Sequence, residues 1–401
     1  MRMVLLLAMW LAVGNAPAGQ KPLDGAIPFD GKWSLDGDKT RIVAEPGGGT
    51  LQVETGFAHL RDVRLLDGTI DVDVRLTTRR SFVYVYFRAQ ADGEREEFYL
   101  RPHKSALPDA VQYAPVWQER SAWQLHHGPG GTAAVPFSAD RWTHVRIIMQ
   151  GRTAALFVDD MSAPALVVPH LSREPQAGYV SLGGFLPSDV PGTGPIAVFK
   201  NVRIRPGVIP FDLAAAATRA SAAATATAAT GAGLAASGSS GTNDRIVTGW
   251  AVSRAFVPGN APEPAALPGD DVAREYRAVP AEADGLVQLH RHIKVAEGTR
   301  VSAAVARVAV KASRDTVAAF DLGFSDVATV FVNSVPVFTG DASYSFDRPR
   351  REGLIGFDQA RLYLPLRAGD NQLAIVITDT FGGWGVMGRF VNAPDLQVSA
   401  R

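Results

Sequence analysis

The sequence predicts an all-β protein made of two β-sandwich (jelly-roll) domains joined by a flexible linker rich in Ala, Thr, Gly and Ser. Three observations support this fold class. Short strand-like stretches recur between Gly, Asp, Asn and Pro turns, no apolar helical period of useful length occurs, and a low-complexity segment divides the chain. We therefore expect one sandwich over residues 24–207, a linker over 211–243 and a second sandwich over 244–401.

The start of the chain is typical of a secretory signal peptide. Arg2 is followed by the apolar run Val4–Val13 and by the small-x-small pattern Ala16-Pro17-Ala18, which predicts a leader over residues 1–18. That run is shorter than the roughly 20 residues of a membrane helix, so we expect no membrane insertion. The chain has no cysteine, which argues against a lipid anchor and leaves no disulfides. An exported protein, periplasmic or extracellular, is the prediction.

The charges of the chain balance. The chain has 40 Lys and Arg residues and 40 Asp and Glu residues, so its formal net charge is zero. A protein without net positive charge has no long-range attraction for nucleic acid or an anionic membrane. We expect no nucleic-acid partner. Partners should be neutral or recognised locally.

The segment from Phe211 to Thr242 has no aromatic residue after its first position and almost no charge or large aliphatic side chain. Such a composition is typical of a linker that buries too little to fold. Its alanines favour a helix, but Thr, Ser and Gly interrupt them, so a frayed helix is the alternative. As a flexible coil, the linker would let the two halves move almost independently.

Strand patterns organise the first half. Thr69–Leu76 alternates apolar and polar side chains, which indicates a strand with one wet side. Phe82–Arg88 is apolar on both faces, which favours a central strand with one face on the core and the other lining a concave or covered surface. We also expect a hairpin of Trp142–Met149 with Thr153–Asp159, and a closing strand at Ile196–Ile204.

The second half has the same character. A turn is expected at Gly369-Asp370-Asn371, immediately before a strand. The short β candidates are Val301–Val310, Thr316–Phe324, Ala328–Val332, Arg361–Leu366 and Gln372–Thr378.

Two stretches of the first half carry a family resemblance. The segment DRWTHVRIIMQGRTAALFVDD at 140–160, between GTIDVDV at 68–74 and VFKNVR at 198–203, resembles the concanavalin-A-like, laminin-G-like jelly-roll superfamily over roughly residues 28–206. That superfamily includes lectins, adhesive modules, glucanases and keto-disaccharide hydrolases. The resemblance implies the fold, and it leaves open which of these functions applies.

The second half carries another resemblance. The segments WAVSRAF at 250–256, VFVNSVPVF at 330–338, GDNQL at 369–373 and FGGWG at 381–385 are similar to the galactose-binding-like sandwich over about residues 245–400. Such modules are appended to exported glycosidases and esterases for sugar binding or for architecture. The resemblance therefore implies a carbohydrate context without showing that this copy binds anything.

The sequence offers no persuasive catalytic centre. Asp71-Val-Asp73 could supply an acid/base pair, but the glucanase pattern Glu-x-Asp-x-Glu has Asp71 and Arg75 at its outer positions here. A cation in place of one carboxylate cannot complete that mechanism. An exposed polar strand face is the simpler interpretation.

The best candidate site is a cluster of aromatic and planar polar side chains. Tyr99, Arg101 and His103 alternate, so in an extended segment they share one face. Rings that cover the apolar face of a sugar, with donors and acceptors for its hydroxyls, are what a carbohydrate site requires. The same rings could equally pack in a core, and an enzymatic role for His103 lacks an evident acid to orient it. The remaining candidate ligand-binding residues are Arg88, Gln112, Tyr113 and Trp123.

In the second half, Trp384 lies among glycines, either plugging the end of the sandwich or presenting its ring at the rim as a second binding position. No transition-metal site and no cofactor is expected. Carboxylates that could hold a structural calcium ion are Asp159 with Asp160, and Asp321 with Asp326, although turn formation explains the same residues.

These observations favour an exported carbohydrate-binding protein that is non-catalytic and recognises a neutral glycan through its first domain. Two alternatives stay open at this stage. One is a glycoside-processing hydrolase of the keto-disaccharide-hydrolase type, and the other is an envelope or adhesive protein.

Overall fold

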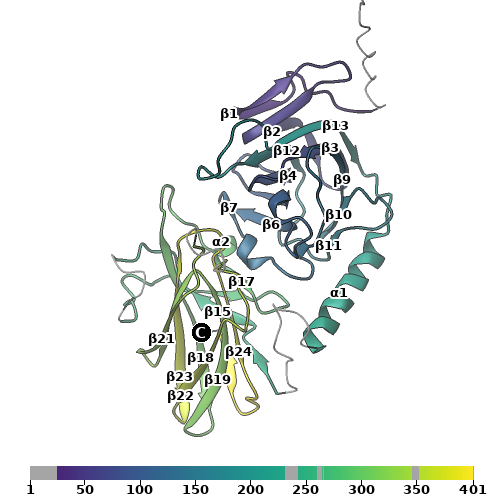
Figure 1. The fold of residues 1–401 in the computed structure, drawn as a ribbon. Helices are drawn as coiled ribbons and strands as arrows, with labels where there is room; N and C mark the ends of the chain where they lie inside the picture. The colour runs from purple at the N-terminus through teal and green to yellow at the C-terminus, as the bar shows by residue number, and fades with distance from the viewer. Residues whose placement is uncertain (1–24, 231–242, 260–263, 265, 346–351, 401) are drawn as a thin grey trace, which may run out of the picture.

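The computed structural model describes residues 25–230, 243–259, 264, 266–345 and 352–400. In this part of the chain the protein is all-β, with two sandwiches of antiparallel sheets, so the predicted fold class is confirmed (Figure 1). We call residues 25–206 the N-terminal sandwich and residues 243–400 the C-terminal sandwich. The predicted leader, residues 1–18, lies outside the described residues. None of the described helices is long and apolar enough to cross a membrane.

The N-terminal sandwich consists of one antiparallel sheet and two short 3-10 helices, η1 (Pro102–Lys104) and η2 (Trp123–Leu125). Its strands are β1 (Ser34–Val43), β2 (Thr50–Leu65), β3 (Gly68–Leu76), β4 (Phe82–Ala89), β5 (Arg95–Leu100), β6 (Val111–Trp117), β7 (Arg120–Ser121), β8 (Thr132–Ala133), β9 (Trp142–Gln150), β10 (Thr153–Val158), β11 (Leu166–Val168), β12 (Gly178–Phe185) and β13 (Ala197–Pro206). The order is β11-β10-β9-β3-β13-β2-β12-β4-β5-β6-β7, with β1 paired to β2 and β8 to β6.

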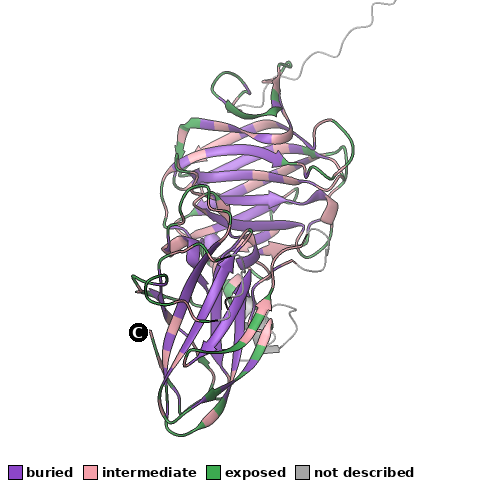
Figure 2. Ribbon diagram, turned by 90° about the vertical axis from the view of Figure 1, so that its left-hand side faces the viewer, coloured by how far each residue is buried: buried purple, intermediate pink, exposed green. Residues whose placement is uncertain are grey.

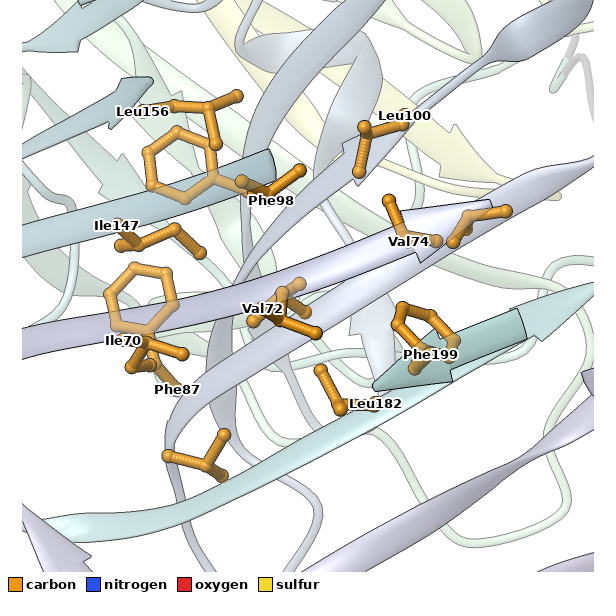
Figure 3. Packing of buried hydrophobic residues seen from close by; sticks show 14 of the residues in the cluster. Ile70, Val72, Val74, Phe87, Phe98, Leu100, Ile147, Leu156, Leu182 and Phe199 are labelled. Atoms are coloured by element: carbon orange, nitrogen blue, oxygen red, sulfur yellow. The ribbon is translucent and has the colours of Figure 1, made fainter. Parts of the chain in front are cut away.

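This sheet folds over on itself because of its alternating side chains. On β3, Ile70, Val72 and Val74 are buried in one core with Phe98 and Leu100 of β5, although four strands separate β3 from β5 in the sheet (Figure 3). Strands so far apart can share a core only if the sheet curls into two layers. The two-faced strand at 82–88 and the hairpin around Gln150-Gly151 are confirmed. The predicted wet side of 69–76 is wrong for Thr69 and Asp71, which are buried, whereas Asp73 is half-buried and Arg75 is exposed.

The C-terminal sandwich has a five-stranded sheet facing a seven-stranded sheet across a second core. The first contains β14 (Arg245–Ile246), β17 (Val287–Gln288), β19 (Thr316–Ser325), β22 (Ala360–Leu366) and β24 (Gly385–Phe390). The second contains β15 (Gly249–Val252), β16 (Arg277–Pro280), β18 (Ser302–Ala312), β20 (Val327–Val332), β21 (Val335–Asp341), β23 (Gly369–Asp379) and β25 (Gln397–Ser399), and a one-turn helix, α2, spans Leu289–His292. The turn predicted at Gly369-Asp370-Asn371 is wrong, because these residues already pair with β18.

The expectation of a flexible coil after the first sandwich is wrong for helix α1 (Leu213–Thr230). The Asp212 carboxylate accepts a hydrogen bond from the Ala215 N–H at 2.9 Å, which caps the helix start. Leu213 packs with Ile148 and Phe157 on the outside of β9 and β10, where Figure 1 shows the helix. Capping and packing thus add to the helix propensity of alanine. Residues 231–242 of the predicted linker lie outside the described residues.

The two sandwiches meet in a polar contact that we call the seam. The Gln118 side chain donates to the His290 and Ile293 carbonyls, both at 2.7 Å, and accepts from the Val295 N–H at 2.9 Å. Figure 2 shows the sandwiches joined end to end, with buried residues concentrated along the strands. Side-chain bonds of this kind fix one body against the other, so the structure does not support the predicted independent movement. The division into separately folding domains stays a prediction.

An ion pair crosses the seam. The Arg120 guanidinium lies 3.1 Å from the Asp379 carboxylate and donates to the Thr299 carbonyl at 2.6 Å. Asp379 is fully buried, and His290 Nε2 lies 3.2 Å from its carboxylate without hydrogen-bond geometry. A buried carboxylate that loses its cation is strongly destabilising, so the N-terminal sandwich stabilises the C-terminal one.

We therefore expect Arg120→Met to lower the free energy of unfolding by about 3 kcal/mol, because it leaves the Asp379 charge buried without its guanidinium. Urea unfolding followed by tryptophan fluorescence measures this loss. The control is Arg254→Met, whose pair with Glu275 is exposed at 44% and 66% and should contribute less than about 1 kcal/mol. Equal losses in the two variants would contradict the coupling.

Candidate functional site

The candidate site is the face of β2, β12, β4, β5 and β6 that points away from the core, which we call the aromatic face. Strand register builds it in rows, because directly paired residues lie on the same side of a sheet. One row runs Phe57, Gly183, Tyr84, Tyr99 and Gln112, and the next runs His59, Ser181, Tyr86 and Glu97. Residues that are distant in sequence thereby form one continuous surface.

The rings of the aromatic face touch one another. Phe57 stacks on Tyr86 with ring centroids 4.6 Å apart and lies 5.9 Å from Tyr84, and Tyr84 lies 5.3 Å from Tyr99. On one side the series continues with His59 and Tyr179, whose ring centroids lie 5.8 Å from each other. Phe82 extends it on the other side, 6.3 Å from both Tyr99 and Phe185. These separations are those of favourable aromatic pairs, so the rings support one another.

Part of this surface is accessible to a ligand. Phe57, His59, Phe82, Tyr84 and Tyr179 are half-buried, and no described residue hydrogen-bonds the Tyr84 hydroxyl. At the edge, Phe185 is 46% exposed. Tyr86 and Tyr99 lie deeper and are buried. The face therefore offers partly exposed ring surface and, at Tyr84, a hydroxyl that no described residue hydrogen-bonds and whose pKa burial raises. The cavity bounded by Ile27, Phe29 and Asn201 is lined by none of these rings.

Gly183 permits the central ring contact. A Cβ atom at this position would come within 2.1 Å of Cδ1 of Phe57, so the Phe57 ring lies directly over the β12 backbone. Any larger residue would displace the ring from its stack on Tyr86. A glycine inside this strand thus marks a close approach of a side chain to the backbone.

Three of the predicted site residues come together on the aromatic face. The Tyr99 hydroxyl donates to Gln112 Oε1 at 2.6 Å, and Arg101 donates to the Tyr99 hydroxyl at 3.2 Å and also to Gln112 Oε1. Arg101 further donates to Asp109 at 2.7 Å. These bonds hold Tyr99, Arg101 and Gln112 together beside the neighbouring rings, although Arg101 Nε is buried without a hydrogen-bond partner.

His103 and Trp123 lie at the border of the face. Strand β5 ends at Leu100 and Pro102 starts η1, so His103 is not in the strand, and its ring lies 5.6 Å from Phe82. Burial, together with the Arg101 charge, lowers the pKa of His103 to about 4, so the imidazole is neutral at physiological pH. Trp123 is half-buried in η2 and meets Tyr344 of the C-terminal sandwich at 5.6 Å.

Arg88 and Tyr113 were predicted in the site, and this is wrong. Arg88 is buried and donates to the Leu66 and Gly151 carbonyls, both at 2.7 Å, because the register shifts where β4 meets β12. Tyr113 follows Gln112 and so points to the opposite side, into the core. There its hydroxyl donates to the Glu96 carboxylate at 2.6 Å.

Sequence reasoning missed most of the ring surface. Phe57, His59 and Arg61 alternate with core residues in the segment 55–63, and Phe82, Tyr84 and Tyr86 alternate with core valines in the segment 82–88. A period of two was visible in both segments. The partnership between them was not visible, because it depends on β12 lying between β2 and β4.

The aromatic face carries one buried carboxylate, Glu97. Burial raises the pKa of Glu97 more than the positive charge of the nearby Arg95 lowers it. The Ser121 hydroxyl donates a hydrogen bond to the Glu97 carboxylate at 2.7 Å. Asp36 of β1 lies across from Phe57 on the same face, four strand spacings or about 19 Å along the sheet from β5. Glycosidases place their two carboxylates roughly 5–9.5 Å apart, so Glu97 and Asp36 do not form such a pair.

Asp71 and Asp73 belong to a network outside β3, β9 and β13. The Asp71 carboxylate accepts from Arg146 and Arg205, both at 2.6 Å, and that of Asp73 accepts from His144 at 2.6 Å. Burial acts to raise the pKa of Asp71, but the bonds from His144 and Arg146 outweigh it and lower the pKa to about 2. Both carboxylates are thus held as anions by cations, which is unsuitable for acid/base catalysis.

The predicted binding role of Trp384 is wrong. Its side chain is fully buried, and the indole N–H donates to the Ile377 carbonyl at 3.1 Å. The ring therefore plugs the sandwich, which is the first of the two interpretations that the sequence left open.

The carboxylates considered for calcium do not fit that ion. Asp321 is held by Arg361 and Arg389, both at 2.6 Å, and two cations disfavour a third. Asp159 pairs with Arg141, and the Asp160 carboxylate accepts from the Ser162 hydroxyl at 2.6 Å. Within the described ranges, no group of three or more His, Cys, Asp or Glu side chains could hold a metal ion.

The His144 network predicts a pH-dependent stability. Hydrogen bonds to Asp71 and Asp73 raise the pKa of His144 to about 9 from an ordinary value near 6.5. Its contribution is therefore complete below about pH 6.5 and is lost as the pH rises through about 9. We expect His144→Gln to cost on the order of 2 kcal/mol at pH 6 and much less at pH 9.5. Urea unfolding of both proteins across this range measures the difference, and a constant gap would contradict the assignment.

No family model matches the chain, and no curated protein matches its sequence. Several solved structures are similar over part of it. A carbohydrate-binding module, CBM66 from Bacillus subtilis, is 15% identical with a TM-score of 0.33, covering 43% of this chain and 95% of the module. Galectin LEC-6 of Caenorhabditis elegans is 9% identical with a TM-score of 0.28, over 43% and 99% of the two chains. A Bacillus licheniformis β-glucanase is 12% identical with a TM-score of 0.33, over 47% and 99%.

Proposed function

We propose that this protein binds carbohydrate through the aromatic face of its N-terminal sandwich and does not cleave it. The observation that carries the proposal is the unbroken series of ring contacts from Tyr179 and His59 through Phe57, Tyr84 and Tyr99 to Phe82, on a sheet face that is only partly covered. A core would bury such rings completely. A sugar site exposes them, because pyranose C–H groups pack against ring faces.

The polar groups beside the rings suit hydroxyl ligands. No described residue hydrogen-bonds the Tyr84 hydroxyl, and burial keeps it protonated by raising its pKa. Burial together with the Arg61 charge lowers the pKa of His59, which favours its neutral form. His59 Nδ1 is hydrogen-bonded with the Ser181 hydroxyl at 2.8 Å, so Nε2 is the ring nitrogen that could bond a sugar hydroxyl. The guanidiniums of Arg61 and Arg95 lie over the Tyr179 and Tyr86 rings, at 4.8 Å and 4.1 Å. Planar donors next to rings match a neutral glycan.

The hydrolase alternative finds less support in the site. Glu97 is deeply buried and bonded to Ser121, and Asp36 of the same face lies far beyond catalytic spacing from it. His103 Nδ1 accepts from the Ser81 N–H at 3.3 Å and the ring packs against Phe82, and no carboxylate in the described part of the chain bonds this imidazole. An adhesive role would need a partner protein on the same rings. The proposal includes export, which follows from the leader at residues 1–18.

We expect the intact protein to bind neutral oligosaccharides on an array of glucose, galactose and mannose oligomers, and Tyr84→Ala to weaken that binding about ten- to hundredfold. The loss follows because a half-buried ring and its hydroxyl would both leave the contact surface. Isothermal titration with the array hits measures the dissociation constant, and thermal melting checks the fold.

Two further variants serve as controls for Tyr84→Ala. Tyr363→Ala removes a ring that is 69% exposed on β22, away from the site, and should bind as the parent does. Tyr84→Phe keeps the ring and should lose only the part of the affinity that the hydroxyl contributes. This variant still tests the site if Tyr84→Ala does not fold. Unchanged affinity in Tyr84→Ala, or no binding by the parent, would contradict the proposed function.

A further inference from the structure

The loop Phe381–Gly385 of the C-terminal sandwich presents one aromatic ring to solvent. Trp384 is buried in the core, whereas Phe381 is 47% exposed. The loop precedes β24 and lies at the seam, where Leu125 of η2 packs against Gly383 and Gly385. The exposed ring therefore lies next to the N-terminal sandwich and not at the far end of the molecule.

Hydrogen bonds fix the position of Phe381. The backbone N–H groups of Thr380 and Phe381 both donate to Asp326 Oδ2 at 2.8 Å, and the Thr380 hydroxyl donates to the same atom at 2.6 Å. Asp326 is fully buried in the C-terminal sandwich. An exposed ring on a backbone held this firmly is pre-organised, and pre-organisation reduces the entropy that binding costs.

The N-terminal sandwich holds the same loop from the other side. The Gly383 N–H donates to Gln124 Oε1 at 2.5 Å, and Gln124 Nε2 donates to Asp326 at 3.2 Å. A Cβ atom at Gly382, where φ is +86°, would come within 1.9 Å of Gln124 Oε1. Glycine is required there because of both the close approach and the left-handed backbone. Phe381 is thus fixed relative to the N-terminal sandwich as well.

Two ring contacts lead from Phe381 to Trp123, and a hydrogen bond joins the Trp123 backbone to Gln112 of the aromatic face. Tyr344 lies 5.7 Å from Phe381 and 5.6 Å from Trp123. The Trp123 carbonyl accepts from Gln112 Nε2 at 2.7 Å, and Gln112 ends the row that begins at Phe57. We call Trp123, Tyr344 and Phe381 the seam aromatics. They continue the aromatic face from the last strand of that row into the C-terminal sandwich.

The charges along this border are paired. Lys104 lies 2.9 Å from Glu352 across the seam and also bonds Asp109, which accepts from Arg101 at 2.7 Å. Among the described residues at this border, these two cations are therefore balanced by these two carboxylates. These pairs give an acidic or basic ligand no net attraction, whereas a neutral polyhydroxylated chain could exchange hydrogen bonds with their side chains.

We propose that the seam aromatics form a second, outer part of the binding site, so that a linear neutral oligosaccharide extends from the aromatic face across the seam to Phe381. Short chains would occupy the aromatic face alone. Longer chains would add stacking on Phe381, which makes the C-terminal sandwich a determinant of chain-length preference. This inference rests on the proposed function of the aromatic face and adds a second sandwich to it.

The test compares affinity with chain length. The probes are the array hits together with glucose oligomers of β-1,3, β-1,4 and α-1,4 linkage, each from two to eight units. We expect Phe381→Ala to bind the shortest oligomers as the parent does and to bind the longest about tenfold more weakly, since one stacked ring is lost. Phe381→Trp should restore the dependence on length. Tyr363→Ala, which removes an exposed ring elsewhere, should change nothing.

The possible failures can be told apart. If the parent binds no oligomer, the proposed function and this inference both fail. If the parent binds but its affinity for long oligomers equals that of Phe381→Ala, the extension across the seam is wrong and the aromatic face stands alone. Tyr84→Ala should weaken binding at every length, which distinguishes the inner part of the site from the outer part.

Discussion

The two-residue period of β4 is the constraint on which this structure depends. Val83, Val85 and Phe87 point into the core, so Phe82, Tyr84 and Tyr86 must point the other way. A shift of one residue would bury the tyrosines and expose the valines, so the burial that stabilises the sandwich also fixes the register of the aromatic face. Stability and site therefore arise from the same pairing.

A second constraint joins the two sandwiches. Three side chains of the N-terminal sandwich, those of Gln118, Arg120 and Gln124, form polar contacts with the C-terminal sandwich. Their partners include the buried carboxylates of Asp379 and Asp326. Unpaired buried carboxylates are costly, so the C-terminal sandwich is most stable when its partner is in place. The same contacts hold the Phe381 loop near Trp123, which links the architecture of the seam to the extent of the proposed site.

The sequence was sufficient for the fold class and for the two-faced strand at 82–88, because these depend on local periodicity. The period of 69–76 predicted the core side correctly but not the burial of Asp71 under Arg146 and Arg205, which come from other strands. Alternation related Tyr99 to Arg101 but failed for His103, which lies in η1, and Gln112 meets Tyr99 through the pairing of β5 with β6. Sequence reasoning failed for Arg88, where a shift in register redirects the side chain, and for Tyr113, whose parity relative to Gln112 was overlooked. Helix α1 and the seam depend on tertiary contacts of Leu213 and Gln118, which no local pattern reports.

Hydroxyl-radical footprinting, with and without a bound oligosaccharide, tests the central claim most directly. It reads the solvent access of individual rings without any substitution. The account predicts that the ligand protects Phe57, Tyr84 and Tyr179 from oxidation, while Tyr363 on β22 and Trp142 on β9 are oxidised as before. Protection of Tyr363 or Trp142, with Tyr84 and Phe57 unchanged, would place the glycan elsewhere and contradict the assignment of the aromatic face.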